Sequence, residues 1–505
     1  MQAVARGRSV GDVGSRRGGD VPGLPIKWHP VSNGEFVPPP PTTLVREATR
    51  RSLAALDANA RRTGVSRRQF LLSACGSATM LAVLAACSKE EATSDGSRPG
   101  GTYDIPPEAT TEPDAAAEAI GGDELIFDVQ THLLDFAAGL PASLAPAFPQ
   151  SDCGEDDPLD CYRRPAFLDL MFLESDTSAI VLSAIPFPGD LLSPEVMAET
   201  IRIGEELCGD GRVFMQAQTN PSAAPVAQLR ESMARVAAEF PITAWKAYCH
   251  AGGPGWFLDD HDPTAPQCGE AFLARAVELG IPRVAVHKGF TAIGGTAPDA
   301  GRFSDPVDVG PAAAAHPDLD LVVYHSGFDI GPDEGPYSEA NTFGVDRLIR
   351  SLRTAGIGPG ENVHAELGST WRFLMSKPTQ AAHVLGKLLV HVGEDNILWG
   401  TDSIWYGSPQ DQIESFRAFQ ISEELQETHG YPALTDEVKA KIFGGNAARL
   451  HGLDPKGGAC RFDKAELEEV RLRRGRKNRT FGPATATAVA LLAARGEPWE
   501  HGLPS

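Results

Sequence analysis

The sequence lacks the features that mark three common classes of protein. Its eight cysteines include no C-x-x-C pair, which argues against a zinc knuckle or a redox dithiol. No glycine-rich turn follows the first predicted strand, so a doubly wound nucleotide-binding sheet is disfavoured. No basic face extends far enough to neutralise phosphates, which argues against nucleic acid as a partner. The net charge is −22, although residues 1–86 hold 12 Lys and Arg against 5 Asp and Glu.

Long apolar runs are also scarce, and one short run follows an export-like motif. Ser66-Arg67-Arg68-Gln69-Phe70-Leu71 resembles a twin-arginine signal, and Leu84-Ala85-Ala86-Cys87 resembles the lipobox of bacterial lipoproteins. We therefore expect export by the twin-arginine pathway, followed by a membrane anchor through lipid at Cys87, in the periplasm or on the cell surface. The alternative is an uncleaved transmembrane anchor over Phe70–Ala86, which is 17 residues long and at the lower limit for a span.

Composition divides the chain around this signal. Residues 1–59 are rich in Gly, Pro and Arg without a sustained apolar period, and predict a disordered leader or a start site assigned too early. The signal occupies residues 60–87, and the polar residues 88–122 predict a flexible tether. Residues 455–505 form a C-terminal extension with helical patterns. Cys153 and Cys161 lie in one polar loop and could form a disulfide after export.

From residue 123 to residue 454, short apolar runs alternate with longer helical patterns eight times. This alternation predicts an α/β fold, a (β/α)8 TIM barrel with the export signal before it and the helical extension after it. The runs are rich in Val, Ile and Leu, as strands covered on both faces should be. The predicted strands are Leu125–Gln130, Ala179–Ile185, Arg212–Gln218, Ile242–Tyr248, Arg283–His287, Leu319–His325, Asn362–Glu366 and Asn396–Gly400.

Polar residues stand at the ends of these strands, where barrel enzymes carry their chemistry. His132 follows the first strand, His287 and His325 end the fifth and sixth, and Asp402 follows the eighth. Three imidazoles and one carboxylate at one end of a barrel form a set that can bind a divalent metal and activate water.

Residues 125–453 resemble the amidohydrolase superfamily, in particular the amidohydrolase-related branch that includes aminocarboxymuconate-semialdehyde decarboxylase. The resemblance rests on five segments distributed along the barrel. They are Phe127-Asp128-Val129-Gln130-Thr131-His132, Val286-His287-Lys288-Gly289, Tyr324-His325-Ser326-Gly327, Ile397-Leu398-Trp399-Gly400-Thr401-Asp402 and Phe443-Gly444-Gly445-Asn446-Ala447-Ala448-Arg449-Leu450.

The resemblance implies a role for several residues. His132 and His287 would be metal ligands, Asp402 a ligand and proton shuttle, and His325 the residue that polarises substrate or helps to activate water. Gln130 departs from the family, which places His or Glu there. An amide oxygen binds a transition metal more weakly than these do, so Gln130 is either a weak ligand or a residue that orients water or substrate.

Three further residues are predicted to bind substrate. Lys246 could be the carboxylated lysine of binuclear relatives, but we favour a simple cation that pairs with a substrate carboxylate or with Glu366. His250, in the glycine-rich loop after the fourth strand, would touch substrate together with Glu366.

The sequence thus predicts a metal-dependent hydrolase that acts on a small polar substrate, carboxylate-bearing or cyclic. The expected cofactor is one divalent metal ion, zinc first and manganese or iron next. The alternatives are a metal-dependent decarboxylase on the same scaffold and a ligand-binding barrel without catalysis. The oligomeric state is left open, a homodimer included.

Overall fold

The computed structural model describes residues 23–28, 31, 38–135, 158–186, 191–208, 211–291 and 300–454. Eight parallel strands form one sheet in which each strand pairs with the next along the chain. They are β2 (Phe127–Thr131), β3 (Ala179–Ser183), β4 (Val213–Thr219), β5 (Ala244–Tyr248), β6 (Arg283–His287), β7 (Asp320–Tyr324), β8 (Val363–Glu366) and β9 (Ile397–Leu398).

The end of β9 meets the end of β2 and closes the sheet. Thr131 and Ser403 form a parallel bridge. The backbone N–H of Asp402 donates to the carbonyl of Gln130 (3.0 Å), and that of His132 donates to the carbonyl of Ser403 (2.6 Å). The predicted (β/α)8 TIM barrel is confirmed.

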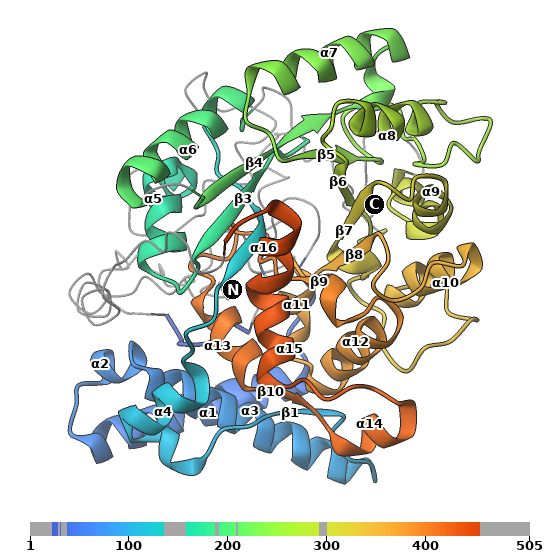
Figure 1. The fold of residues 1–505 in the computed structure, drawn as a ribbon. Coiled ribbons are helices and arrows are strands. Elements are labelled where there is room, and N and C mark those ends of the chain that lie inside the picture. Colours follow the sequence, from blue (N-terminus) through green and yellow to red (C-terminus); the bar gives the residue numbers. More distant parts are fainter. Residues whose placement is uncertain are drawn as a thin grey trace, which may run out of the picture.

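Helices surround the sheet because each strand is buried on both faces and needs cover outside. Figure 1 shows them as an outer ring. In chain order they are α5 (Arg164–Leu168), α6 (Pro194–Cys208), α7 (Val226–Glu239), α8 (Gly269–Glu278), α9 (Val309–Ala315), α10 (Val345–Ala355), α11 (Thr370–Leu374) and α12 (Pro378–His391). After β9 come α13 (Gln410–Ala418), α14 (Glu423–His429), α15 (Asp436–Ala440) and α16 (Asn446–His451).

The N-terminal region is more ordered than the sequence suggests. Where a disordered leader is expected, α1 (Thr43–Thr63) begins at an N-cap, Thr42, and ends at Gly64 in the left-handed conformation. It packs directly against α3 (Ala74–Ser94). The short α2 (Arg67–Leu71) connects the two helices along the chain. The buried side of α1 consists of Val45, Ala48, Ser52, Leu56 and Ala60. These residues are three or four positions apart, but most are small, so their apolar period is weak.

Part of the expected tether also belongs to the folded body. The strand β1 (Gly101–Tyr103) pairs antiparallel with β10 (Phe419–Ile421), and α4 (Pro113–Ile120) contacts α13. The prediction of a flexible tether therefore fails for residues 101–120. Backbone pairing with β10 orders a segment that has few apolar side chains, and composition alone does not report such pairing.

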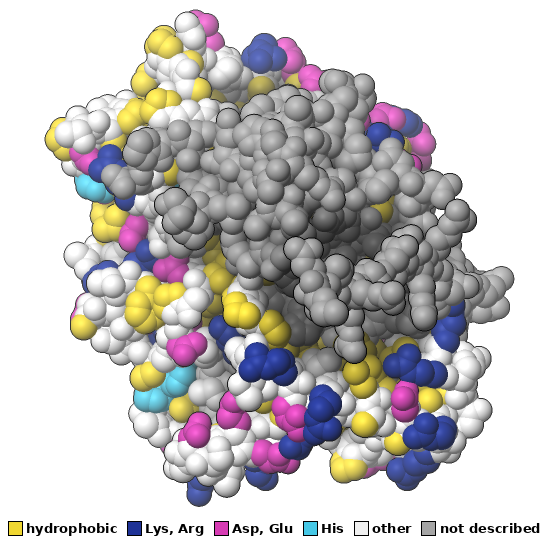
Figure 2. Space-filling model, turned by 180° about the vertical axis from the view of Figure 1, so that it is seen from behind, with side chains coloured by type: hydrophobic (Ala, Val, Ile, Leu, Met, Phe, Trp, Pro, Cys, Tyr) yellow, Lys and Arg dark blue, Asp and Glu magenta, His cyan; other side chains and the backbone are white. Residues whose placement is uncertain are grey.

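The block formed by α1 to α4 lies below the barrel in Figure 1. Acidic and basic side chains are interspersed along the same lower edge of the molecule in Figure 2. Ion pairs join the helices of the block: Arg51 Nη1 of α1 lies 2.8 Å from Glu90 Oε2 of α3, and Arg67 Nε of α2 lies 2.6 Å from Asp57 Oδ1 of α1.

Cys87, the expected lipid attachment site, is a buried residue of α3. Attachment of a lipid to its Sγ would require α3 to separate from α1. Within the described part of the chain, no helix is long and apolar enough to cross a membrane. Cys161 is disulfide-bonded. Cys153 and the C-terminal extension 455–505 lie outside the described residues.

Candidate active site

The four residues expected to carry the chemistry all lie at the carboxyl ends of barrel strands. His132 follows β2, His287 ends β6, His325 follows β7, and Asp402 lies four residues after β9. Each is almost fully buried. Buried polar side chains that converge at this end of a barrel are typical of an enzyme site.

Backbone strain gathers at the same strand ends. Five non-glycine residues have positive φ angles there: Phe290 (49°) after β6, His325 (66°) and Ser326 (54°) after β7, Ser369 (53°) after β8, and Asp402 (58°) after β9. Such a conformation costs about 1–2 kcal/mol per residue relative to ordinary backbone. Proteins keep this cost mainly at functional sites, where it aims particular side chains. It also explains why β7 ends at Tyr324, one residue before the predicted end.

The carboxylate of Asp402 is the centre of a hydrogen-bond network. Its Oδ1 accepts from Gln130 Nε2 (3.0 Å) and lies 3.1 Å from His132 Nε2. Its Oδ2 accepts from Ser369 Oγ (2.6 Å), which also lies 2.7 Å from the hydroxyl of Tyr406. Three elements of the barrel therefore hold one carboxylate in place.

This network decides the charge of Asp402. Burial by itself would raise the pKa of the carboxyl group, but the hydrogen bond and charge of His132, the charge of His325 and the Ser369 hydroxyl outweigh burial and lower it. Asp402 is therefore an anion at neutral pH.

The contact between His132 and Asp402 suits a bound cation. His132 Nδ1 contacts the carbonyl of Ser183, which can only accept, so Nδ1 carries a proton. His132 Nε2 and Asp402 Oδ1 lie 3.1 Å apart, and a positive charge shared by the two atoms, either a proton on Nε2 or a bound cation, makes this contact favourable. The Oε1 atom of Gln130 is buried without a hydrogen-bond partner among the described residues. Imidazole, carboxylate and amide donors thus fit a divalent ion.

His287 lies on another side of the site. Its ring centroid is 4.6 Å from that of His325 and 4.6 Å from that of His250, which is also buried. Burial first, and then the neighbouring charges, lower the pKa of His287 well below its ordinary value, so it is neutral. Among the described residues no three His, Cys, Asp or Glu side chains converge as a complete metal-ligand group, so His287 does not join His132 and Asp402 in this conformation.

His325 is placed to accept a proton. Its Nδ1 lies 2.7 Å from the carbonyl of Gly368, so Nδ1 carries the proton and Nε2 keeps its lone pair. Burial lowers the pKa of His325 to about 4, although the charge of Asp402 and the Gly368 hydrogen bond act in the opposite direction. A neutral imidazole near a carboxylate can act as a general base.

Glu366 holds the backbone at His325 in place through hydrogen bonds. Its carboxyl group accepts from the backbone N–H groups of His325 (3.0 Å) and Gly368 (2.5 Å), and burial raises its pKa well above the ordinary value. Gly400 makes room for it, because a Cβ atom there would lie 1.6 Å from Glu366 Oε1. Both carboxyl oxygens of Glu366 thus accept backbone N–H groups, and its pairing with Lys246 stays a prediction.

Lys246 is a fully buried cation inside the barrel. Its Nζ lies 3.6 Å from the ring centroid of Tyr324 and 4.4 Å from that of Tyr248. Aromatic faces stabilise an ammonium group without neutralising it. Lys246 is therefore held against aromatic faces inside the barrel.

The sequence reasoning missed three residues that arrange the site. Ser369 and Tyr406 hold Asp402, as described above. Asp128 accepts from the backbone N–H groups of Gln130 (3.1 Å) and Thr401 (3.0 Å), so it joins the ends of β2 and β9. Burial raises the pKa of Asp128 to about 7. Its position two residues before Gln130, which predicts the same face of the strand for both side chains, was the available signal.

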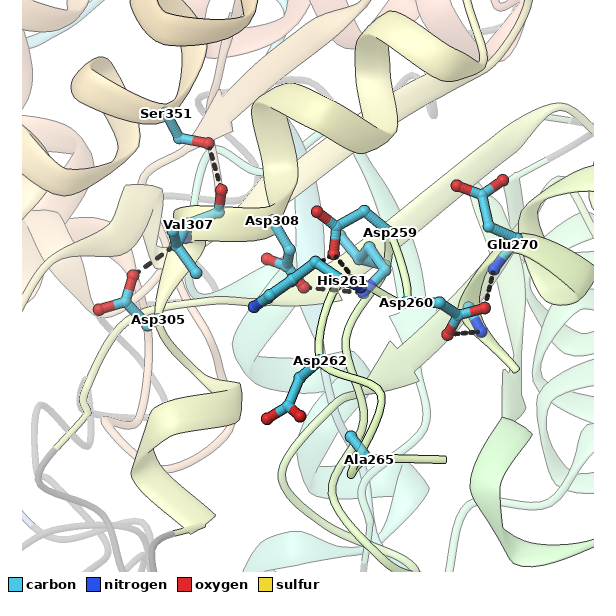
Figure 3. Close-up of polar contacts among 12 residues, drawn as sticks. Asp259, Asp260, His261, Asp262, Ala265, Glu270, Asp305, Val307, Asp308 and Ser351 are labelled. Carbon is cyan, nitrogen blue, oxygen red and sulfur yellow. Dashed lines mark hydrogen bonds and ion pairs between the residues drawn. The ribbon is translucent and has the colours of Figure 1, made fainter. Parts of the chain in front are cut away.

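The loop after β5 forms part of the same end of the barrel, and carboxylates fix its shape (Figure 3). Asp260 caps the start of α8 by accepting from three backbone N–H groups at 2.9–3.2 Å. Asp308 accepts from the N–H of Leu258 (2.8 Å). His261 Nδ1 lies 2.6 Å from Asp259 Oδ1, and the His261 side chain is exposed.

The chain is similar to the structure of a putative 2-pyrone-4,6-dicarboxylic acid hydrolase from Pseudomonas putida (16% identity, 66% of this chain and 99% of that chain, TM-score 0.39). It is also similar to 5-carboxyvanillate decarboxylase from Sphingomonas paucimobilis (15%, 66% and 100%, TM-score 0.38) and to an amidohydrolase from Burkholderia multivorans with bound zinc (17%, 65% and 100%, TM-score 0.38).

No curated protein matches the chain. Residues 127–453, well over half of the chain and nearly the whole barrel, match the family model described as Amidohydrolase. Members of this family typically use a divalent metal ion. The chain belongs to the amidohydrolase family.

Proposed function

We propose that this chain is a metal-dependent hydrolase acting on a small polar substrate that carries a carboxylate or is cyclic. The observation that carries the proposal is the pair formed by an anionic Asp402 and a neutral His325 on strained backbone at the carboxyl ends of β7 and β9. Backbone strain gathers at active sites and ligand clamps, and here it aims an imidazole and a carboxylate that together can accept a proton.

His132, Asp402 and His287 would hold the ion. When bound, a divalent ion polarises a carbonyl group and makes water more acidic. Zinc is the first candidate because imidazole and carboxylate ligands suit it, and manganese or iron is the next.

The residues of the chain supply the proton transfers. His325 Nε2 takes a proton from water as the water oxygen bonds to the substrate carbonyl carbon. The same proton then passes to the leaving atom as its bond to that carbon breaks. Ser369 and Gln130 keep Asp402 oriented through both steps. Lys246 would attract a substrate carboxylate toward the centre of the barrel.

Decarboxylation is the second candidate. Burial raises the pKa of the Glu366 carboxyl group well above its ordinary value, which favours its neutral form, and the group accepts from the backbone N–H of His325 (3.0 Å). A neutral acid and an imidazole can together deliver the proton that replaces carbon dioxide on a carbon atom.

Turnover of defined carboxylates tests both candidates. The purified chain would be offered 2-pyrone-4,6-dicarboxylate and 2,6-dihydroxybenzoate with zinc or manganese, with Asp402→Asn as the control. Ring opening that Asp402→Asn abolishes supports the hydrolase, and carbon dioxide release that it abolishes supports the decarboxylase. Binding of these compounds without turnover, unchanged in Asp402→Asn, would favour a ligand-binding barrel.

We also propose export by the twin-arginine pathway. The exposed positions of Arg67 and Arg68 support it, because the signal must be accessible on a folded protein. Replacement of both by Lys should keep the protein in the cytoplasm, as measured by cell fractionation. An unchanged distribution would contradict the proposal.

A further inference from the structure

A short segment near the N-terminus is inserted between the helical block and the barrel. Ile26, Lys27 and Trp28 are all buried, although they precede the export-like motif by about 40 residues. The neighbouring Pro25 contacts the start of α3, where a Cβ atom on Gly76 would lie 3.2 Å from Pro25 Cγ. The segment is therefore packed on both sides.

Lys27 holds the start of α13 at two points. Its Nζ lies 3.0 Å from Asp411 Oδ1 and donates to the carbonyl of Ser408 (2.8 Å). Its backbone N–H donates to Asp411 Oδ2 (2.9 Å). Ser408 and Asp411 end the loop that begins at Asp402, so Lys27 ties down the far end of that loop.

The same loop carries a side chain that orients Asp402. The hydroxyl of Tyr406 lies 2.7 Å from Ser369 Oγ, which donates to Asp402 Oδ2 (2.6 Å). Arg372, three residues after Ser369, contacts Asp411 Oδ2 (3.3 Å) and lies 5.6 Å from the ring of Tyr406. Asp411 is thus shared between Lys27 and α11, the helix whose N-cap is Ser369.

We propose that Lys27 is a positioning residue for the active site, acting through Asp411 and the 402–411 loop on the orientation of Asp402. The proposal rests on the function proposed above only in what it says about turnover. It also implies that cleavage before Cys87 would remove a residue that the site needs, so the uncleaved chain is the fully active form.

The test compares Lys27→Met with Lys27→Arg in the full chain, and uses Lys89→Met, an exposed lysine of α3, as the matched control. Amide hydrogen exchange of residues 402–409 is measured first, because it needs no substrate. Lys27→Met should exchange faster there than Lys89→Met, and Lys27→Arg should restore much of the protection. If Lys27→Met does not fold, Lys27→Gln replaces it in the test, because the glutamine side chain keeps an N–H donor group.

Turnover is measured second, on whichever carboxylate the wild type converts and well below the unfolding temperature. Lys27→Met should lower kcat about 10- to 100-fold, the range for a misplaced catalytic group, with little change in KM, and Lys27→Arg should recover it. Equal loop exchange in Lys27→Met and Lys89→Met would overturn the proposal, and so would wild-type kcat in Lys27→Met. Failure of the wild type to convert any substrate would count against the proposed function alone, and the exchange result would still decide the role of Lys27.

Discussion

The hydroxyl group of Ser369 offers a sharp test of how the site holds its carboxylate. Replacing Ser369 by Ala removes the 2.6 Å hydrogen bond to Asp402 Oδ2 and the contact with Tyr406. A hydrogen bond to a charged group contributes about 1.5–3 kcal/mol, so kcat should fall about 10- to 150-fold if the bond is needed in the transition state. The assay is steady-state turnover of the carboxylate identified with the wild type.

Ser369→Gly separates the hydroxyl group from the backbone. Both variants lack the hydroxyl, but only glycine relieves the positive φ of 53°, which costs about 1–2 kcal/mol in other residues. We expect the two variants to lose kcat equally, while Ser369→Gly unfolds at the higher temperature. Wild-type kcat in both would refute the argument, and a loss in Ser369→Ala alone would assign the effect to backbone strain.

Three other predictions concern the metal, a glycine and pH. The purified chain should contain about one divalent ion. Gln130→His should bind zinc more tightly, measured by competition with a coloured chelator, because imidazole is the better ligand. An unchanged affinity would place residue 130 away from the ion. Gly400→Ala should destabilise the fold by about 3 kcal/mol or more in urea unfolding, because its Cβ would overlap Glu366 Oε1, and a normal stability would show that Glu366 can move. The pKa of His325 is lowered from 6.5 to about 4, so between these pH values the unfolded chain binds a proton at this residue and the folded chain does not. The free energy of unfolding should therefore fall by about 3 kcal/mol as pH drops from 6.5 to 4. His325→Gln should remove that part of the slope, and a slope that stays would assign it to other groups.

The barrel could be predicted from the sequence because its strands carry a local signal. Each is a short apolar run with a helical pattern after it, and β6, Arg283–His287, has the predicted bounds. The place of His132, His325 and Asp402 at the strand ends follows from the same pattern. Their roles in catalysis stay predictions.

The remaining features depend on contacts that no local pattern contains. No local pattern marks Ser369, because Asp402 and Tyr406 lie beside it only in the folded chain. The buried side of α1 uses alanine and serine, whose burial is visible only once α3 lies against them. The sequence predicts Gln130 as a weak ligand or an orienting residue, and in the structure its amide nitrogen donates to Asp402.

The contact between Lys27 and Asp411 spans 384 positions of the chain. A ribosome that adds about 5–20 residues per second needs about 20 to 80 s to make that length, and during this time Lys27 has no Asp411 to bind. The partner of β1 in the sheet, β10, is also made only near the end of synthesis. Docking of the N-terminal region can therefore be completed only after the last barrel strand has been synthesised, so it is a late step of folding.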